Sequence, residues 1–167
     1  MTGVQTCALP ILHLNLDLAV KNLGETQALA TSLAKCCSSL QDVFVIYLIG
    51  DLGAGKTTLA QSFIQFFGFD RVKSPTYSLV ESYQNELANI HHFDCYRLSD
   101  PEELDYIGIR EYLSPGSIQL IEWPELGKGV IAKADISINL KGDYDERQIN
   151  IQGHSDIGKK VIECAIS

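Results

Sequence analysis

The residues that most clearly point to chemistry form one eight-residue segment, GDLGAGKT, at positions 50–57. It fits the pattern G-x-x-x-x-G-K-[ST], in which glycines let successive backbone N–H groups turn inward around a polyphosphate. A helix that follows directly adds the positive end of its dipole. We expect the Lys56 ammonium to reach the β- and γ-phosphates and the Thr57 hydroxyl to bind a bridging Mg²⁺. The segment therefore predicts a site for a nucleoside triphosphate with magnesium.

Magnesium-dependent hydrolysis also needs a carboxylate near the metal, and two predicted strands supply candidates. In the segment HHFDC at positions 91–95, strand alternation places His92 and Asp94 on one face and Phe93 and Cys95 on the other. Asp94 can therefore face a site while its apolar neighbours pack. The same alternation separates neighbouring histidines, which argues against a zinc site built from this segment.

The second candidate carboxylate ends the apolar segment IQLIE at positions 118–122. An acid at the carboxyl end of a parallel strand has the usual position for meeting a metal at that edge of the sheet. Glu122 is therefore the second predicted ligand. For each acid alone, a solvated strand end is the alternative, and the phosphate loop favours the metal interpretation. Trp123, the only tryptophan, follows directly and either fills the core or covers the site.

These residues need a framework of alternating strands and helices. Period-two and buried patterns predict strands, whereas apolar residues at helical spacing predict helices. The expected strands are 12–18, 43–49, 77–83, 90–94, 118–122, 136–140 and 149–151, and the expected helices are 25–40, 56–67 and a short one that starts around 99–103. The last two strands form an antiparallel hairpin, and 157–166 is either a helix or a strand. The pattern predicts one α/β domain with a mixed, mainly parallel sheet flanked by helices.

Composition limits the possible classes of protein. The chain has 167 residues, of which 46% are hydrophobic, which is enough for one domain with a buried core. Its formal net charge of −8 disfavours a broad nucleic-acid footprint. No apolar run approaches the roughly 20 residues that span a bilayer. Five cysteines without a C-x-x-C pair favour a reducing cytoplasm. Residues 1–11 follow no periodicity, and we interpret them as a disordered tail or a non-native segment.

Three further segments occur in a characteristic order after the phosphate loop: SPTY at 74–77, HFDCYRL at 92–98 and EWPE at 122–125. Together with GDLGAGKTT they resemble the bacterial TsaE (YjeE) family over about residues 16–151. The resemblance implies an ATPase that takes part in making threonylcarbamoyladenosine in tRNA. It also implies that residues 12–167 form a P-loop NTPase-like domain.

The resemblance further implies cofactors, partners and roles for single residues. ATP and Mg²⁺ would be the cofactors, and a threonylcarbamoyl transferase subunit pair of the TsaD and TsaB type would be the partner, with tRNA contacted only indirectly. Thr57 and Glu122 would hold the metal, and Asp94 would lie beside it or bind through water. Lys56, Asp94 and Glu122 would be catalytic. The expected nucleotide-binding residues are Thr26, Asp51, Leu52, Gly53, Ala54, Gly55, Lys56, Thr57, Thr58, Thr76, Trp123 and Arg147.

Several alternatives remain open from the sequence. Ser74-Pro75 fits a simple extended turn, and Tyr96-Arg97 fits either a surface pair or a contact with phosphate or a partner. A small-molecule kinase would share the loop and the metal site, but the four arginines of the chain form no clustered lid. A nucleotide-gated adaptor is the other rival. Because no water-activating residue or arginine finger stands out, we expect slow turnover by the isolated chain.

Overall fold

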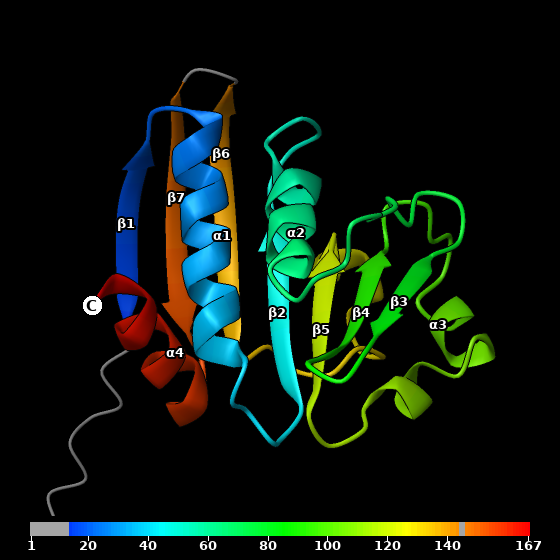
Figure 1. Cartoon of the computed structure of the whole chain (residues 1–167). Coiled ribbons are helices and arrows are strands. Elements are labelled where there is room, and N and C mark those ends of the chain that lie inside the picture. The colour runs from blue at the N-terminus through cyan, green and yellow to red at the C-terminus, as the bar shows by residue number, and fades with distance from the viewer. Residues whose placement is uncertain (1–13, 144–145) are drawn as a thin grey trace, which may run out of the picture.

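The computed structural model describes residues 14–143 and 146–167, and the predicted tail at 1–11 lies outside them. Its centre is a seven-stranded sheet in the order β1-β7-β6-β2-β5-β4-β3 (Figure 1). The strands are β1 (Asn15–Val20), β2 (Phe44–Ile49), β3 (Val80–Gln84), β4 (Asn89–Asp94), β5 (Ser117–Glu122), β6 (Ile136–Asp143) and β7 (Glu146–Gly153). The helices are α1 (Leu23–Cys37), α2 (Lys56–Gln65), α3 (Glu103–Tyr106) and α4 (Asp156–Ile166), with 3₁₀ turns η1 (Ile109–Tyr112) and η2 (Pro124–Gly127).

The sheet is parallel in its centre and antiparallel at both edges. Strands β6, β2, β5 and β4 run parallel to one another, whereas β3 pairs antiparallel with β4. Strand β7 pairs antiparallel with both β6 and β1. The predicted α/β class, mixed sheet and C-terminal hairpin are therefore confirmed. Strand β2 lies in the middle because its apolar side chains can be buried on both faces of the sheet.

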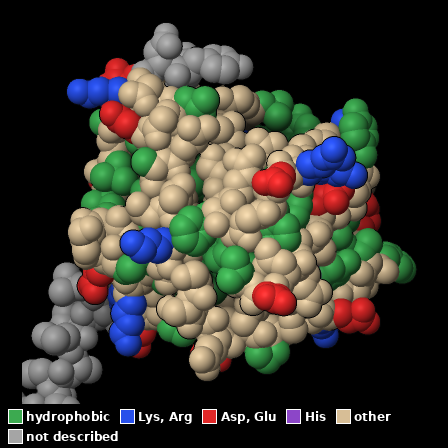
Figure 2. Space-filling model, viewed as in Figure 1, with side chains coloured by type: hydrophobic (Ala, Val, Ile, Leu, Met, Phe, Trp, Pro, Cys, Tyr) green, Lys and Arg blue, Asp and Glu red, His purple; other side chains and the backbone are tan. Residues whose placement is uncertain are grey.

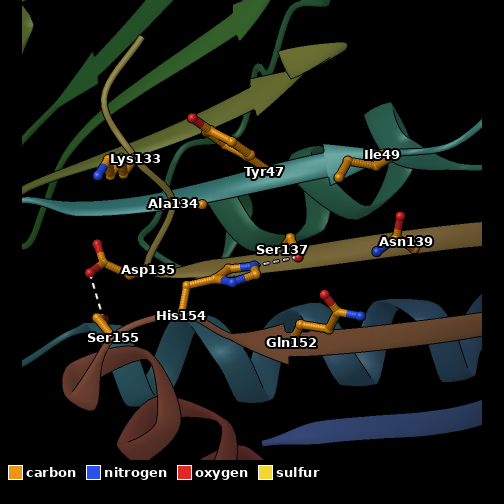
Figure 3. A pocket seen from close by; sticks show the side chains of 10 residues that line it. All are labelled: Tyr47, Ile49, Lys133, Ala134, Asp135, Ser137, Asn139, Gln152, His154 and Ser155. Carbon is orange, nitrogen blue, oxygen red and sulfur yellow. Dashed lines mark hydrogen bonds between the residues drawn. The ribbon is translucent and has the colours of Figure 1, made fainter. Parts of the chain in front are cut away.

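The two faces of the sheet are covered unequally. Helices α1, α2 and α4 lie together on one face in Figure 1, over the larger apolar core. On the other face, a smaller core joins side chains of β2, β4 and β5 to α3, η1 and the segment after η2. Strands β6 and β7 alternate buried isoleucines with polar side chains such as Ser137 and Asn139. Their second face therefore carries polar side chains, several of which are drawn in Figure 3.

Local contacts explain why β3 starts later than predicted, where α3 begins and why the C-terminal segment is a helix. Strand β3 starts at Val80, because the preceding residues form turns that end at Leu79, whose φ is 67°. Helix α3 starts only at Glu103, whose carboxylate accepts hydrogen bonds from the backbone N–H groups of Ser99 and Asp100. The C-terminal segment is helix α4, and the Ser155 hydroxyl caps it by accepting from the Gly158 N–H.

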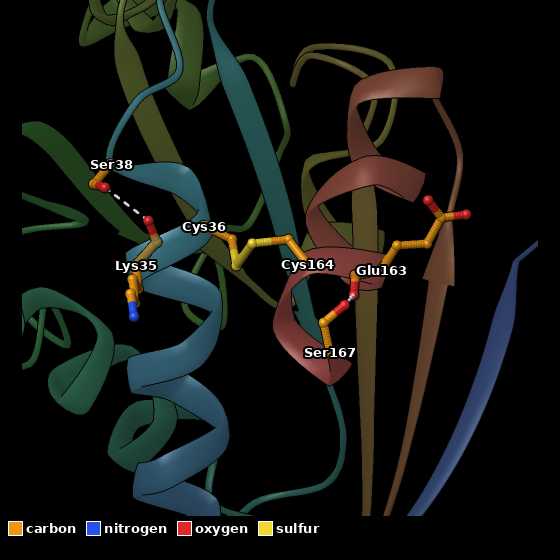
Figure 4. The surroundings of a disulfide bond; sticks show 6 residues. All are labelled: Lys35, Cys36, Ser38, Glu163, Cys164 and Ser167. Carbon is orange, nitrogen blue, oxygen red and sulfur yellow. Dashed lines mark hydrogen bonds between the residues drawn. A yellow bond between two sulfur atoms is a disulfide. The ribbon is translucent and has the colours of Figure 1, made fainter.

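A disulfide between Cys36 and Cys164 joins α1 to α4 (Figure 4). The cysteine spacing gave no sign of this pair, because its members are 128 residues apart and meet only through helix packing. Cys37 and Cys95 are buried free thiols, and burial raises the pKa of each to about 12. The cysteine pattern favoured a reducing compartment, in which free thiols are typical. The disulfide between Cys36 and Cys164 departs from that expectation.

The disulfide leads to a prediction about stability. A cross-link across so long a loop restricts the unfolded chain, so Cys164→Ser should lower the free energy of unfolding by about 2–4 kcal/mol. Thermal or urea unfolding in oxidising buffer measures this loss. In buffer with dithiothreitol the disulfide of the wild type is reduced, so the variant and the wild type should unfold alike. This comparison of the two proteins under reducing conditions is the matched control. Equal stability in oxidising buffer would contradict the prediction.

Among the described residues, no helix has both the length and the apolar character needed to cross a membrane. Figure 2 shows the helix-bearing face, where acidic and basic side chains are scattered among apolar and uncharged atoms. They do not gather into a basic patch on that face.

Candidate nucleotide-binding site

The register of the parallel strands brings the predicted chemical segments to one edge of the sheet. Strand β2 pairs with β5 so that Leu48 lies opposite Glu122, and the glycine loop begins two residues later at Gly50. Strand β4 pairs with β5 so that Asp94 also lies opposite Glu122. The loop and both candidate carboxylates therefore meet at the carboxyl ends of three neighbouring strands, as expected for a ligand site in this class of sheet.

The loop between β2 and α2 is tight, and two of its glycines are needed for steric reasons. At Gly50 a Cβ atom would lie 2.5 Å from the Leu140 carbonyl oxygen. Because that oxygen belongs to the backbone, it cannot easily move away. Gly55 has φ 104° and caps α2, and a Cβ there would lie 3.0 Å from the Arg147 Cζ. No side chain caps the N-terminus of α2, so its first-turn N–H groups are left for a ligand.

The Lys56 side chain is folded back over its own loop. It is 4% exposed, and its Nζ donates to the carbonyl oxygens of Gly50, at 2.5 Å, and Asp51, at 2.8 Å. The same Nζ lies 4.4 Å from the centroid of the Trp123 ring. Burial lowers the pKa of Lys56, and the nearby Glu122 carboxylate partly opposes this shift. The ammonium is therefore positioned inside the loop by neutral acceptors.

Glu122 lies at the centre of a small polar cluster. It is 2% exposed, and both of its carboxylate oxygens accept from the Thr57 hydroxyl at 3.1 Å. Asp94 is half-buried beside it and accepts from the backbone N–H of Tyr96 at 3.0 Å. Burial raises the pKa of Asp94, the Tyr96 hydrogen bond opposes the shift, and the Glu122 charge adds to it. These hydroxyl and carboxylate oxygens are the ligand types that Mg²⁺ prefers.

His92 extends this cluster in a way that the sequence did not predict. Strand alternation placed it beside Asp94, and the structure adds a contact of 2.8 Å between its Nε2 and the Glu122 Oε1. The ring is fully buried, and its Nδ1 has no hydrogen-bond partner among the described residues. His91 points to the opposite face, where its Nδ1 lies 2.8 Å from the Ser82 hydroxyl. The predicted alternation along β4 is therefore confirmed.

Thr26 and Arg147 form the wall behind the loop. Thr26 is fully buried on α1, and its hydroxyl accepts from the Arg147 Nη1 at 3.4 Å. Arg147 comes from β7, is 6% exposed and lies against Gly55. Its Nε has no hydrogen-bond partner among the described residues. The contact joins residues 121 positions apart, so α1 and β7 together place a buried guanidinium against the base of the loop.

Most of the predicted site residues line one cavity of about 440 Å³. Thr26 and Ala54 lie behind its wall, and Asp51 instead lines a smaller hollow of about 190 Å³ on the other side of the loop. Ser74, Tyr96 and Arg97 also line the main cavity, although they were not among the predicted site residues. The predicted residues in the lining are Leu52, Gly53, Gly55, Lys56, Thr57, Thr58, Thr76, Asp94, Glu122, Trp123 and Arg147.

A larger cavity of about 860 Å³ lies elsewhere, on the face of β6 and β7 that carries polar side chains (Figure 3). Its lining includes Tyr47, Asp135 and the Ser137 hydroxyl, which lies 2.8 Å from the His154 Nε2. It shares no lining residue with the cavity beside the glycine loop. The convergence of chemically matched groups therefore identifies the candidate site, whereas cavity size does not.

The family described as "Threonylcarbamoyl adenosine biosynthesis protein TsaE" matches residues 20–149, which include every segment that forms the cavity. The chain belongs to the TsaE family. A relative from Haemophilus influenzae, named tRNA threonylcarbamoyladenosine biosynthesis protein TsaE, is 48% identical over 125 residues, covering 74% of this chain and 79% of the relative. A relative of the same name from Bacillus subtilis is 36% identical over 131 residues, covering 77% and 79%.

A solved structure supports the same assignment at the level of the fold. The crystal structure of Bacillus subtilis YdiB superimposes with a TM-score of 0.74 at 26% identity, covering 93% of this chain and 96% of that chain. The predicted P-loop NTPase-like fold and the resemblance to TsaE are therefore confirmed. Family and fold together indicate nucleotide binding, and the loop at 50–57 is the part of the chain whose geometry suits a polyphosphate.

Proposed function

We propose that this TsaE-family protein is an ATP-binding, Mg²⁺-dependent ATPase required for tRNA threonylcarbamoyladenosine formation. One observation carries the proposal: Lys56, Thr57, Asp94 and Glu122 converge on a single cavity at the end of the glycine loop. The relatives' names supply the pathway. The chain would bind and hydrolyse ATP and would not itself transfer the threonylcarbamoyl group.

Triphosphate binding would use groups that already lie in place. Backbone N–H groups of the loop and of the first turn of α2 would donate to the phosphates. The Lys56 Nζ would exchange its carbonyl acceptors for the more strongly accepting β- and γ-phosphate oxygens. Arg147 and Thr26 would support the loop from behind, and Trp123 would shield the Lys56 ammonium from water.

The donor set around Glu122 fits magnesium. Thr57 and Glu122 would hold the ion, and Asp94 would lie beside it or bind through water. When bound, Mg²⁺ would supply positive charge that offsets the negative charge developing on the phosphates. Apart from the two predicted metal ligands Glu122 and Asp94, no carboxylate or histidine among the described residues lines the cavity, so we expect slow turnover by the isolated chain.

The partner would be a threonylcarbamoyl transferase subunit pair of the TsaD and TsaB type, located with this protein in the cytoplasm. Contact with tRNA would run through that pair. The net charge of −8 and the scattered charges on the helix-bearing face (Figure 2) support an indirect role, since direct RNA binding needs a positive surface.

A nucleoside digest of tRNA tests the proposal directly. Cells depleted of this protein should lose threonylcarbamoyladenosine from their tRNA, and a plasmid carrying the wild-type chain should restore it. A plasmid carrying Lys56→Ala should fail to restore it, although the variant accumulates to the same level. An unchanged digest after depletion would overturn the proposed pathway while leaving nucleotide binding untouched.

The His92–Glu122 contact makes a prediction about the metal. Removing a hydrogen-bond partner of a metal ligand commonly weakens metal affinity about 10–100-fold. His92→Leu should therefore raise the Mg²⁺ concentration needed for half-maximal hydrolysis by about that factor. His92→Gln places a donor near the position of Nε2 and should retain more of the metal affinity. Magnesium titrations at saturating ATP measure the effect, and identical midpoints for wild type and His92→Leu would contradict it.

A further inference from the structure

Arg97 is an exposed lining residue of the nucleotide cavity and has no anionic partner among the described residues. It follows β4 by three residues, lines the cavity and is exposed to solvent. Its guanidinium lies 4.8 Å from the centroid of the Tyr77 ring. Among the described residues it forms no salt bridge. A cation with five N–H donors therefore stands beside the cavity with most of its hydrogen-bonding capacity unused.

The other two cations of the cavity are held at the glycine loop, from which Lys56 would meet the phosphates. Lys56 is buried inside the loop against two carbonyl oxygens, and Arg147 is buried behind Gly55 against Thr26. Neither can move to the far side of a bound triphosphate without breaking the loop. Arg97 comes from the segment that follows Asp94, is not part of the loop and also lines the cavity. It is thus the cation placed to meet the outermost phosphate.

The stacking of Arg97 on Tyr77 joins two segments that also share a backbone contact. The Asp94 N–H donates to the Leu79 carbonyl oxygen at 3.0 Å, and the Leu79 N–H donates to the Pro75 carbonyl oxygen at 3.1 Å. Leu79 has φ 67°, a strained conformation for a side chain of this size, so the turn is fixed in shape. Tyr77, on this turn, is 89% exposed. A cation–π contact at such an exposed site is weak and is easily given up for a phosphate.

We propose that Arg97 is an arginine finger supplied by the chain itself, which Tyr77 holds aside until a triphosphate occupies the cavity. The inference rests on the proposed function and deepens it. The guanidinium leaves the Tyr77 ring and donates to oxygens of the γ-phosphoryl group, where negative charge is redistributed as the reaction proceeds. Its planar fork matches the geometry of phosphate oxygens, which a lysine ammonium does not.

The step it assists is ordinary hydrolysis. The oxygen of water forms a bond to the γ-phosphorus, and the bond from that phosphorus to the β–γ bridging oxygen breaks. ADP leaves with the electron pair of that bond, and the proton released by water passes to phosphate or solvent. Arg97 stabilises charge by hydrogen bonds and is not consumed in this step. Its contribution is therefore greatest in the transition state.

Aluminium fluoride provides a test that is independent of turnover. With ADP and Mg²⁺ it mimics the transferring phosphoryl group, and the dissociation rate of a fluorescent ADP measures how tightly that state is held. In the wild type, fluoride should slow ADP release. In Arg97→Ala this release should be at least tenfold faster than in the wild type, while affinity for ADP alone changes less than twofold. Arg97→Lys should behave like Arg97→Ala. Arg110→Ala, which removes an exposed arginine from η1, is the matched control and should behave like the wild type.

The Tyr77 side of the proposal has its own measurement. Tyr77→Ala removes the ring that holds Arg97 aside and should raise basal hydrolysis severalfold, whereas Tyr77→Phe keeps the ring and should not. Equal fluoride-dependent release in Arg97→Ala and wild type would overturn the proposal, as would a wild type that binds ADP but does not respond to fluoride. If Arg97→Ala lost affinity for ADP alone by the same factor as for ADP with aluminium fluoride, the proposal would be overturned too. Arg97 would then contribute to binding of ADP in the ground state. A wild type that binds no ADP would instead refute the proposed function itself.

Discussion

Lys56→Ala is expected to weaken ATP binding by roughly a hundredfold to a thousandfold. Hydrogen bonds to charged groups are worth about 1.5–3 kcal/mol each, and values in the lower part of that range for two phosphate contacts give a loss of about 3–4 kcal/mol. The native side chain is 4% exposed and already lies inside the loop, so no other described cation can take its position. Calorimetric titration with ATP and Mg²⁺ measures the loss.

Lys35→Ala is a suitable control for this experiment, because Lys35 is an exposed lysine in the last turn of α1, away from the cavity. It should bind ATP as the wild type does. Thermal unfolding of both variants separates lost binding from lost folding, since Lys56→Ala also leaves two carbonyl oxygens of the loop without a donor. Unchanged affinity in a folded Lys56→Ala protein would contradict the assignment of the phosphate site.

Glu122→Gln is expected to lower hydrolysis at least about a hundredfold, within the range typical of a lost catalytic group, while ATP still binds. Glutamine keeps the size of the side chain and can still accept from Thr57 and His92, but it carries no charge for a metal. Phosphate release in a single turnover measures the chemical step. Nucleotide affinity measured without Mg²⁺ should change little, because the phosphate-binding loop is intact.

Glu163→Gln, an exposed substitution on α4, is the matched control and should hydrolyse ATP normally. Glu122→Gln itself also distinguishes an ATPase from a nucleotide-gated adaptor. If hydrolysis is required, Glu122→Gln should bind ATP and fail to support modification of tRNA. If ATP binding alone orders a surface for the partner, the variant should support one round. Hydrolysis at the wild-type rate in Glu122→Gln would contradict the metal-site assignment.

How much was predictable depends on how local each feature is. The glycine loop, β2 and α2 were predicted together because backbone N–H groups, Lys56 and Thr57 are contiguous in the chain. The central placement of β2 followed from its two apolar faces, and the hairpin of β6 and β7 from period-two alternation. The order of the segments SPTY, HFDCYRL and EWPE was enough to suggest the family, which the comparisons confirm.

Contacts between distant segments were not predictable from local pattern. Alternation placed His92 on the same face as Asp94, but its bond to Glu122 depends on the register of β4 against β5. The stacking of Arg97 on Tyr77 depends on a turn fixed by Leu79, for which a bulky residue at positive φ gives no sequence signal. The tyrosine and arginine were visible in the sequence, but their relation to the cavity was not.

The sequence by itself determined the class of fold, the phosphate loop and the two acids at strand ends, because hydrophobic period and glycine spacing act over a few neighbouring residues. Only the tertiary structure decided which distant side chains meet. The pairs Thr26–Arg147, His92–Glu122 and Cys36–Cys164 are separated by 121, 30 and 128 residues. Strand register and helix packing bring such pairs within hydrogen-bonding or bonding distance, and a shift of one residue would turn the strand side chains to the other face.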